Sequence, residues 1–358
     1  MKILYLMQVD WNWIKQRPQF LAKLLSKQHE VMVVYPRQRN RKGLCRNESE
    51  GIKMIPVYQI PLQGSISFLR KIAESLTKVI IRHRIKCFCP DVVWLCSPSF
   101  IKYLEKGKYR IVYDCMDDYY SMSRNRDILT WEDETCKCAN AIFASSQSLI
   151  KKLQDRYGVP EKLIYLIRNG FEAEPFDYSD QKKDDAFHIG YVGTISEWFD
   201  FEAIEYVISN TNGVIFDLFG PCKESIRAAH VSDRIVFHGV IEHSQIYYNI
   251  SGLDCLIMPF VLNDIIESVD PVKLYEYISY NKNIISVQYE EVQRFENFVH
   301  FYSSKDELLN CVKSVMANNR LKYSLEDKEQ FLKMNTWENR VYRINEILDS
   351  LDGQGDSI

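Results

Sequence analysis

Short apolar runs recur along the first half of the chain and alternate with segments whose apolar residues have the spacing of a helix. Each run is four to six residues long and ends at polar or turn-forming residues, which is typical of buried strands. Helical spacing is plainest at Arg17–Ser26 and Trp131–Ala139. The strands predicted in this half are Lys2–Met7, Glu30–Tyr35, Ile52–Val57, Val92–Cys96, Ile111–Asp114, Ala141–Ser145 and Leu163–Ile167.

The second half repeats this alternation. Strands that alternate with helices form parallel sheets with helices packed on both faces. The pattern therefore predicts an α/β protein with two Rossmann-like, doubly wound domains and a cleft between them. The strands predicted here are Ile189–Val192, Val214–Phe219, Ile235–Phe237, Cys255–Pro259, Asn283–Val287 and Phe301–Ser303, and the helices are Phe201–Ser209, Ser244–Ser251, Pro271–Tyr280 and Lys305–Asn318.

The predicted domain boundary lies at the turn Arg168–Phe171, which the polar run Tyr178–Asp185 follows. We expect one domain over residues 1–170 and a second over residues 171–335. The last helical pattern, Trp337–Leu351, belongs to residues 336–358 and is predicted to cross back to the first domain. We expect the tail Asp352–Ile358 to be disordered.

The composition is that of an ordinary globular protein, with 46% hydrophobic and 26% charged residues. The apolar start of the chain meets Gln8 and Asp10 too soon for a signal peptide and is better explained as a core strand. No apolar run approaches the roughly 20 residues that a membrane-spanning helix needs.

The formal charge is divided unevenly along the chain. Residues 1–170 hold 29 Lys and Arg against 16 Asp and Glu, a net charge of +13, whereas residues 171–358 carry −16. Basic residues concentrate at Arg37–Lys42 and at Phe68–Lys86, where they mix with apolar residues at roughly helical spacing. Such a helix either docks on an anionic membrane surface or packs on its own domain as an ordinary amphipathic helix. Nucleic acid is not the expected partner, because no nucleic-acid-binding motif accompanies the charge.

The cysteines and histidines do not have the spacing of a metal site. Ten cysteines are scattered, and the closest pairs, Cys87/Cys89 and Cys136/Cys138, are separated by one residue rather than by the two to four typical of zinc ligands. The seven histidines are dispersed as well. We expect no bound metal, and we expect the buried thiols to be reduced in a cytosol.

Two segments of the second half carry candidate chemistry. In one, a helix begins at a proline and places Lys273 and Glu276 three residues apart on one face. In the other, Val192–Asp200, an apolar strand ends at Gly193 and Thr194, where backbone N–H groups can approach a phosphate closely. Lysine suits a diphosphate and glutamate suits a ribose diol, so the segments predict a site for a nucleotide-diphosphate sugar that needs no metal. Taken alone, Lys273 and Glu276 also fit a surface ion pair.

Several motifs occur in the order found in GT-B glycosyltransferases, which the chain resembles over nearly its whole length. They are Tyr157–Pro160 with Ile167–Gly170, Gly190–Gly193, Val236–Val240, Asp254–Pro259 and Pro271–Tyr277. The last of these, with the pattern P-x-K-x-x-E-Y, is the most specific. A closer resemblance, to teichuronic acid, capsular and exopolysaccharide glycosyltransferases, is carried by Trp13–Gln19, Val112–Asp118 and Glu197–Asp200.

This resemblance implies an enzyme of the hexosyltransferase type. It would move a sugar from a nucleotide-diphosphate sugar to a lipid-linked or polysaccharide acceptor in bacterial cell-surface polysaccharide synthesis, with no metal and no cofactor besides that co-substrate. It would work as a peripheral protein on the inner face of the cell membrane, with its first domain binding the acceptor and its second binding the nucleotide sugar. The expected donor-binding residues are Gly193, Thr194, Lys273, Glu276 and Ser268, and Arg17, Trp198 and Asp200 are expected near the acceptor or the diphosphate. Arg17 also fits a sheet-edge ion pair.

The candidate catalytic residues follow from one departure from the family pattern. Ser268 stands eight positions before Glu276, where many retaining relatives have a glutamate. We therefore expect an inverting transfer, which needs a base for the acceptor proton. Asp117 and Asp118 follow a predicted strand of the first domain, and two adjacent carboxylates can divide such work, one with a raised pKa and one ionised. The pair also fits a helix N-cap beside a solvated acid.

Two other functions stay open. The first is a nucleotide-sugar epimerase of the same fold, against which the scattered histidines and the basic first half argue. The second is a non-catalytic subunit of a polysaccharide assembly complex, which the presence of both acids and of Lys273 and Glu276 disfavours. Fold analogy alone does not separate these functions from the transferase.

Overall fold

The computed structural model describes residues 1–13, 15–38, 50–59, 67–105, 107–123, 125–172, 184–242 and 245–352. The chain forms two compact units: unit 1 contains Met1–Gly170 and Trp337–Ile358, and unit 2 contains Phe171–Thr336. The chain passes from one unit to the other after Gly170 and after Thr336. Parts of three predicted features, at residues 39–42, 178–183 and 353–358, lie outside the described residues.

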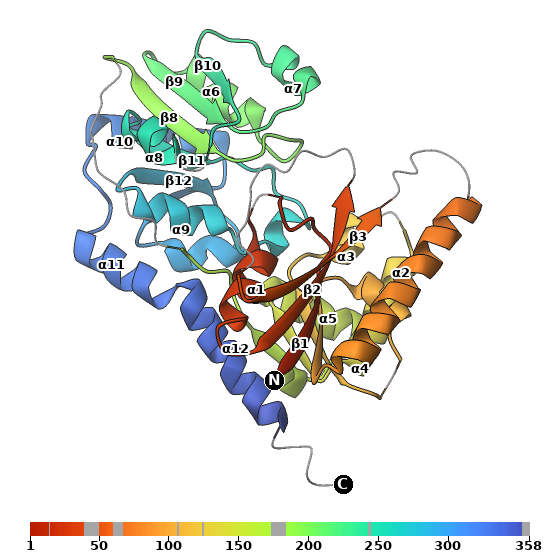
Figure 1. Ribbon diagram of the computed structural model, residues 1–358. Coiled ribbons are helices and arrows are strands. Elements are labelled where there is room, and N and C mark those ends of the chain that lie inside the picture. The colour runs from red at the N-terminus through yellow and green to blue at the C-terminus, as the bar shows by residue number, and fades with distance from the viewer. Residues whose placement is uncertain are drawn as a thin grey trace. The chain divides into compact units, whose positions relative to one another are not determined.

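Unit 1 is built on a seven-stranded parallel sheet with the order β3-β2-β1-β4-β5-β6-β7 (Figure 1). The strand order reverses at β1, whose neighbours are β2 and β4. In open α/β sheets, ligands bind beyond the carboxyl ends of the strands at such a switch point. The strands are β1 (Lys2–Leu6), β2 (Glu30–Gln38), β3 (Ile52–Gln59), β4 (Val92–Leu95), β5 (Arg110–Cys115), β6 (Ala141–Ala144) and β7 (Ile164–Leu166).

Helices cover both faces of this sheet, because alternate strand residues point to opposite sides. Ile3 and Tyr5 pack with α1 (Arg17–Leu25) and α12 (Trp337–Asp352), where Trp337 stacks on Phe20. Leu4 and Leu6 pack in a second cluster on the other face. That cluster includes residues of α2 (Ser67–Phe88), α4 (Asp127–Cys138) and α5 (Gln147–Tyr157); the remaining helices of the unit are α3 (Tyr119–Met122) and the 3-10 helices Pro98–Tyr103 and Glu161–Leu163.

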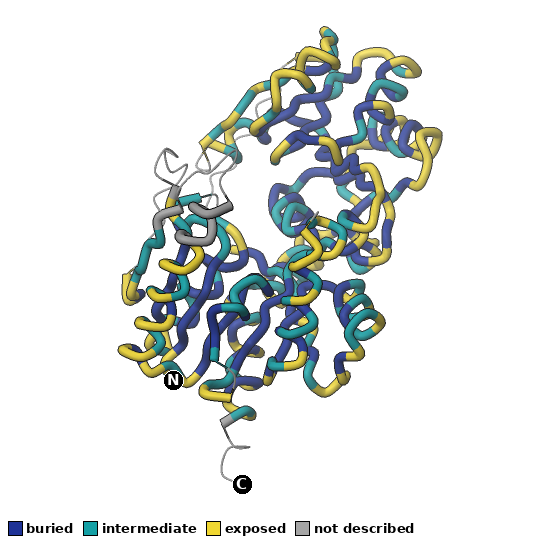
Figure 2. Tube along the Cα trace, turned by 90° about the vertical axis from the view of Figure 1, so that its right-hand side faces the viewer, coloured by how far each residue is buried: buried dark blue, intermediate teal, exposed yellow. Residues whose placement is uncertain are grey.

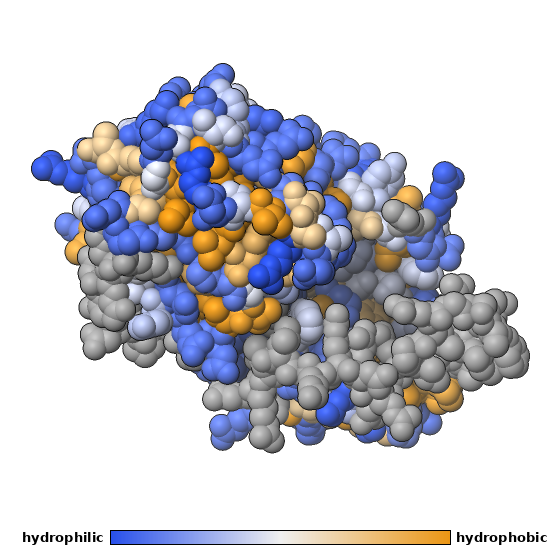
Figure 3. Space-filling model, turned by 90° about the horizontal axis from the view of Figure 1, so that it is seen from above, coloured by the Kyte–Doolittle hydropathy of each residue, from blue (hydrophilic) through white to orange (hydrophobic). Residues whose placement is uncertain are grey.

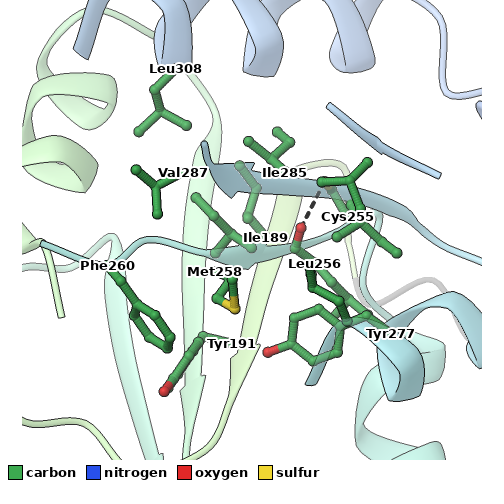
Figure 4. Packing of buried hydrophobic residues seen from close by; sticks show 14 of the residues in the cluster. Ile189, Tyr191, Cys255, Leu256, Met258, Phe260, Tyr277, Ile285, Val287 and Leu308 are labelled. Carbon is green, nitrogen blue, oxygen red and sulfur yellow. Dashed lines mark hydrogen bonds between the residues drawn. The ribbon is translucent and has the colours of Figure 1, made fainter. Parts of the chain in front are cut away.

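Unit 2 repeats the plan with a six-stranded parallel sheet of order β10-β9-β8-β11-β12-β13, reversing at β8. Its single hydrophobic core contains Tyr191, Met258, Tyr277 and Ile285 (Figure 4). The strands are β8 (Phe187–Val192), β9 (Val214–Phe219), β10 (Ile235–Gly239), β11 (Cys255–Met258), β12 (Asn283–Val287) and β13 (Val299–Tyr302). The helices are α6 (Phe201–Ser209), α7 (Glu224–Ala229), α8 (Ile246–Ser251), α9 (Val272–Ser279), α10 (Lys305–Ala317), α11 (Leu325–Met334) and the 3-10 helices Ile266–Ser268 and Glu290–Phe295.

Burial follows this layering. Figure 2 shows the central strands of each sheet as runs of buried residues, whereas the edge strands and the helices also carry partly buried or exposed positions. Apolar side chains also reach the surface among polar ones, as the face in Figure 3 shows. The predicted fold class, two parallel sheets with helices on them, is confirmed.

The predicted strands all form, and most ends shift by only one to three residues. The helix predicted from Trp131 begins earlier, at Asp127. Four helices, α3, α5, α7 and α11, lie in segments for which no helix was predicted. The basic segment Phe68–Lys86 forms the greater part of α2.

Candidate functional site

In unit 2, two glycines at the carboxyl ends of neighbouring strands allow the two main-chain segments to approach each other closely. Gly193 follows β8 and Gly220 follows β9, with φ of +150° and +140°. A Cβ atom on Gly220 would lie 2.0 Å from the carbonyl oxygen of Gly193, and one on Gly193 would lie 2.3 Å from Cε of Lys273. Side chains are therefore excluded at both positions, and the loop after β8 offers side-chain-free backbone beside a lysine.

Lys273 lies in the first turn of α9, next to this glycine loop. Its ammonium is 5.8 Å from the ring centroid of Tyr191. Burial lowers the pKa of Lys273, and Glu276 offsets part of this effect. Within the described residues the ammonium forms no hydrogen bond and no ion pair. A desolvated cation without such a partner is costly, so the position suits an anion held against the N-terminus of α9.

Two tyrosines of the unit 2 core fix the backbone on either side of Gly193. The hydroxyl of Tyr277 accepts a hydrogen bond from the Val192 N–H at 2.9 Å, and the hydroxyl of Tyr191 donates to the Thr194 carbonyl at 3.0 Å. Figure 4 shows both rings in the core. The final tyrosine of the P-x-K-x-x-E-Y pattern therefore orders the strand end that leads into the glycine loop.

The other expected donor residues flank Lys273 along the chain. Glu276 lies on α9, three residues after Lys273, and is partly exposed. Ser268 is buried at the end of a 3-10 helix, where its hydroxyl donates to the Asp264 carbonyl at 2.7 Å. The structure thus gives Ser268 a bond within its own turn, and its contact with a donor stays a prediction.

Trp198 and Asp200 lie in the segment that joins β8 to α6. Asp200 caps α6, because its carboxylate accepts the Ala203 N–H at 2.9 Å. Trp198 is 36% exposed, and its carbonyl accepts the Val261 N–H at 2.8 Å. The structure places Trp198 near the carboxyl ends of the neighbouring strands β8 and β11, whereas the carboxylate of Asp200 is engaged by its own helix.

In unit 1 the adjacent acids Asp117 and Asp118 have opposite environments. Asp118 is buried and caps α3; its carboxylate binds Lys152 at 2.9 Å and Arg156 at 2.6 Å. Burial alone would raise the pKa of Asp118, but the hydrogen bonds from Arg156, Lys152 and Ser121 hold it well below its usual range. Asp118 therefore fits the N-cap alternative and is held ionised by α5.

Asp117 carries the opposite shift. Burial, and secondarily the charge of Asp114, raise the pKa of Asp117 to about 6, while Arg17 acts in the opposite direction. Within the described residues its carboxylate accepts no hydrogen bond. It lies two residues beyond the carboxyl end of β5, on the edge of the sheet where ligands bind. A carboxylate with a pKa near neutrality is suited to general base catalysis.

Arg17 is buried in unit 1, where it links strand β5 to the last segment before unit 2. Its guanidinium binds Asp114 at 2.8 Å and donates to the Ile167 carbonyl at 2.7 Å and the Arg168 carbonyl at 3.2 Å. The ion-pair alternative is thus the one the structure contains, although the pair is buried rather than at the sheet edge. A direct contact of Arg17 with acceptor or diphosphate stays a prediction.

Neither a metal-binding cluster nor a membrane-spanning helix occurs in the part of the chain that the structure describes. Among the described residues, no group of three or more histidine, cysteine, aspartate or glutamate side chains is arranged to hold a metal ion. None of the helices in that part of the chain combines the length and apolar character needed to cross a membrane.

The sequence did not predict which residues form ion pairs with Asp118 and with Arg17. Lys152 and Arg156 are 34 and 38 residues from Asp118, and Asp114 is 97 residues from Arg17. The spacing of Lys152 and Arg156 shows that they share a helix face, but no local signal indicates which carboxylate they reach. Asp270, which forms an ion pair with Arg294 just before α9, was missed for the same reason.

Comparison with known proteins supports the expected class. The model of Glycosyltransferase Family 4 matches residues 19–174. TuaH of Bacillus subtilis (strain 168), a provisionally assigned teichuronic acid biosynthesis glycosyltransferase, is 20% identical over an alignment of 346 residues, and the match covers 85% of each chain. Among solved structures, sucrose-phosphate synthase from Thermosynechococcus elongatus has a TM-score of 0.75 at 11% identity, covering 99% of this chain and 100% of that chain. Anabaena HepE in complex with UDP and glucose has a TM-score of 0.69 at 15% identity, covering 98% and 100%. The match of the family model to the first part of the chain, the relative and the shared fold together support a glycosyltransferase of the GT-B type.

Proposed function

We propose that this glycosyltransferase moves a hexose from a nucleoside-diphosphate sugar to a lipid-linked or polysaccharide acceptor in the synthesis of a bacterial cell-surface polymer. The observation that carries the proposal is the approach of Lys273 to Gly193: a desolvated ammonium lies beside side-chain-free backbone at the N-terminus of a helix. These are the groups that bind a diphosphate. The proposal requires no metal, since Lys273 and the N–H groups supply the positive potential.

The nucleotide and the polymer are proposed from the relatives. HepE was solved with UDP and with UDP-glucose, so a uridine nucleotide is the first donor to test. TuaH carries the assignment to teichuronic acid synthesis, and a second fold relative, WaaB, is a lipopolysaccharide outer core galactosyltransferase. Both act on cell-surface polymers by name, which supports a glycan acceptor of that kind.

We assign the acceptor base of an inverting transfer to Asp117 rather than Asp118. Asp118 is already bound by two cations, whereas the carboxylate of Asp117 has a raised pKa. In the reaction, the acceptor hydroxyl oxygen forms a bond to the anomeric carbon of the donor as the bond to the diphosphate oxygen breaks. The hydroxyl proton passes to Asp117, and the charge on the departing diphosphate is stabilised by Lys273.

We further propose that unit 1 docks on the inner face of the cell membrane through α2. Leu76, Val79, His83 and Lys86 follow helical spacing on this helix, and all four are exposed. The opposite side of α2 contributes Ile81 and Phe88 to the core. The helix therefore packs on its own domain and still presents an apolar and basic face outward, which joins the two alternatives left open by the sequence.

The first experiment measures the melting temperature with UDP, GDP, ADP and TDP in the presence of EDTA. A ligand that binds only the folded protein raises its melting temperature, so we expect UDP to do so without metal and to lose the effect in Lys273→Met. If none of the diphosphates stabilises the protein, the donor site is wrong. If stabilisation requires added Mg²⁺ or Mn²⁺, the metal-free mechanism is wrong.

A further inference from the structure

Helix α3, which begins two residues after Asp117, is clamped from three sides. The carboxylate of Asp118 accepts hydrogen bonds from the backbone N–H and the hydroxyl of Ser121, at 3.4 and 2.8 Å. The ion pairs of Asp118 with Lys152 and Arg156 connect the same cap to α5. The hydroxyl of Tyr119 donates to the Cys96 carbonyl at 2.8 Å, just beyond the end of β4. This four-residue helix is thus held in a fixed position at the carboxyl edge of the sheet.

The clamp leaves two large apolar side chains of α3 at the surface. Tyr120 is 54% exposed and Met122 is 53% exposed. The guanidinium carbon of Arg156 lies 4.3 Å from the centroid of the Tyr120 ring, so one face of the ring rests on a cation that Asp118 holds in place. Single exposed apolar residues are ordinary, but here an aromatic ring is oriented by its neighbours and lies three residues from the proposed base.

We propose that Tyr120 is a stacking platform for the pyranose ring of the acceptor. The inference rests on the proposed function in that the acceptor binds unit 1 next to Asp117. A pyranose ring presents a face of C–H bonds, and such weakly positive hydrogens are attracted by the negative face of an aromatic ring. The cation on the far side of Tyr120 fixes the ring at little cost, because its charge is already balanced by Asp118.

The size of the patch favours a sugar ring over the lipid tail of an acceptor. Tyr120 and Met122 are the exposed large apolar residues of α3, and the other ones in the described part of unit 1, Leu76, Val79, Leu166 and Tyr342, lie on α2, β7 and α12. A single tyrosine ring is comparable in area to a single pyranose ring. A prenyl chain would need a longer apolar surface to be held out of water.

The test uses lipid-free methyl hexopyranosides as probes and saturation-transfer NMR as readout, with the full chain and saturating UDP. The variants are Tyr120→Phe, Tyr120→Ala and, as a matched control, Tyr342→Ala, an exposed tyrosine of the same unit that is 68% exposed. We expect at least one glycoside to bind wild type. Its Kd should rise about fivefold to tenfold in Tyr120→Ala, stay within about twofold in Tyr120→Phe, and not change in Tyr342→Ala.

The outcomes separate this inference from the function on which it rests. Equal affinity in Tyr120→Ala and wild type, an equal loss in Tyr120→Phe, or binding of no glycoside overturns the platform. Melting temperatures of the variants should match that of wild type, because Tyr120 is a surface residue; a fall in Tyr120→Ala alone would assign the residue to the stability of α3 and also overturn the proposal. The measurement needs no sugar transfer, so an inactive Asp117→Asn that still binds the glycoside leaves the platform intact and tests the base by itself.

Discussion

The two neighbouring acids of unit 1 show how burial alone does not decide the chemistry of a carboxylate. Asp118 is bound by two cations and a helix N-terminus, so its ionised form is stabilised. Asp117 is desolvated next to Asp114, so its neutral form is favoured. A base must release its proton at working pH and take one up during the reaction. Asp117 is suited to this task, whereas Asp118 is suited to holding helices together.

Replacing Asp117 with asparagine should abolish catalysis without weakening the fold. Loss of a general base typically costs about 10²–10⁴-fold in rate. Because the pKa of Asp117 is raised to about 6 in the fold, its ionisation lowers the unfolding free energy as pH rises from about 4. Asp117→Asn should therefore be at least as stable as wild type at pH 7–8. The measurements are kcat and thermal unfolding at several pH values.

The pH dependence of wild-type activity gives a second test of the role of Asp117. The active form is the ionised carboxylate, so kcat/KM should rise with pH and level off above about pH 6. A profile that is flat from pH 5 to pH 8, or an Asp117→Asn variant that retains activity, would refute the base. Retention of the donor's anomeric configuration in the product would refute the inverting mechanism.

Replacing Lys273 with methionine should weaken nucleotide binding and leave the unliganded fold intact. A charge-assisted contact is worth about 1.5–3 kcal/mol, or roughly 10–150-fold in affinity. The apo protein loses only a desolvated cation whose pKa burial already lowers. Nucleotide Kd by calorimetry and the melting temperature without ligand are the measurements.

Lys282→Met is the matched control for this prediction. Lys282 is a buried lysine of the same unit, and its ammonium donates to the Ser251 carbonyl at 3.0 Å. Its loss should lower the melting temperature and leave nucleotide affinity unchanged. The opposite result, a destabilised Lys273→Met with normal affinity, would make Lys273 a structural residue.

At the level of elements, the sequence predicted what depends on local pattern and missed what depends on distant partners. The apolar runs predicted the strands correctly, because a strand that is buried on both faces is apolar along most of its length. Helix α5 was missed although Ser146 caps it and Gly158 ends it in the left-handed region. Only Leu149 and Leu153 are buried among its residues, so its apolar stripe is short. The helix that carries Lys273 was likewise predicted from local sequence, whereas the opposite environments of Asp117 and Asp118 come from α5 and β5 after folding.

Helix α3 and its link to α5 should depend on Asp118. Asp118→Ala removes an N-cap and leaves Lys152 and Arg156 without their carboxylate, which should destabilise unit 1 by about 2–4 kcal/mol. The folded pKa of Asp118 is lowered, so its contribution is fully present above the unfolded value of about 3.9 and is lost progressively as the pH falls from there through the folded pKa. Urea unfolding should show a smaller difference between variant and wild type at pH 3 than at pH 7. The same difference at both values would show that charge is not its source.

At the scale of the whole molecule, the path of the chain between the two units determines how its charge is distributed. Helix α12 returns the C-terminal residues to unit 1, where Trp337 packs against Gly170 so closely that a Cβ on the glycine would lie 2.7 Å from the Trp337 nitrogen. Unit 2 is one uninterrupted segment, inserted between two parts of unit 1. The strong positive charge of residues 1–170 is therefore confined to unit 1, which leaves unit 2 acidic.

This division predicts that unit 1 carries the membrane affinity and that α2 directs it. Each Lys or Arg near an anionic surface contributes about 1 kcal/mol, and that attraction falls with salt; insertion of Leu76 and Val79 adds about 1.5–3 kcal/mol for each side chain that is fully buried. Wild type should therefore sediment with phosphatidylglycerol vesicles but not with phosphatidylcholine vesicles, and high salt should release it. A Leu76→Ser/Val79→Ser double variant should bind at least about tenfold more weakly, whereas Tyr342→Ser, which removes an exposed apolar residue from α12, should bind as wild type does. If both vesicle types bind equally, the attraction is not electrostatic. If the double variant binds normally, the membrane contact of unit 1 does not involve α2.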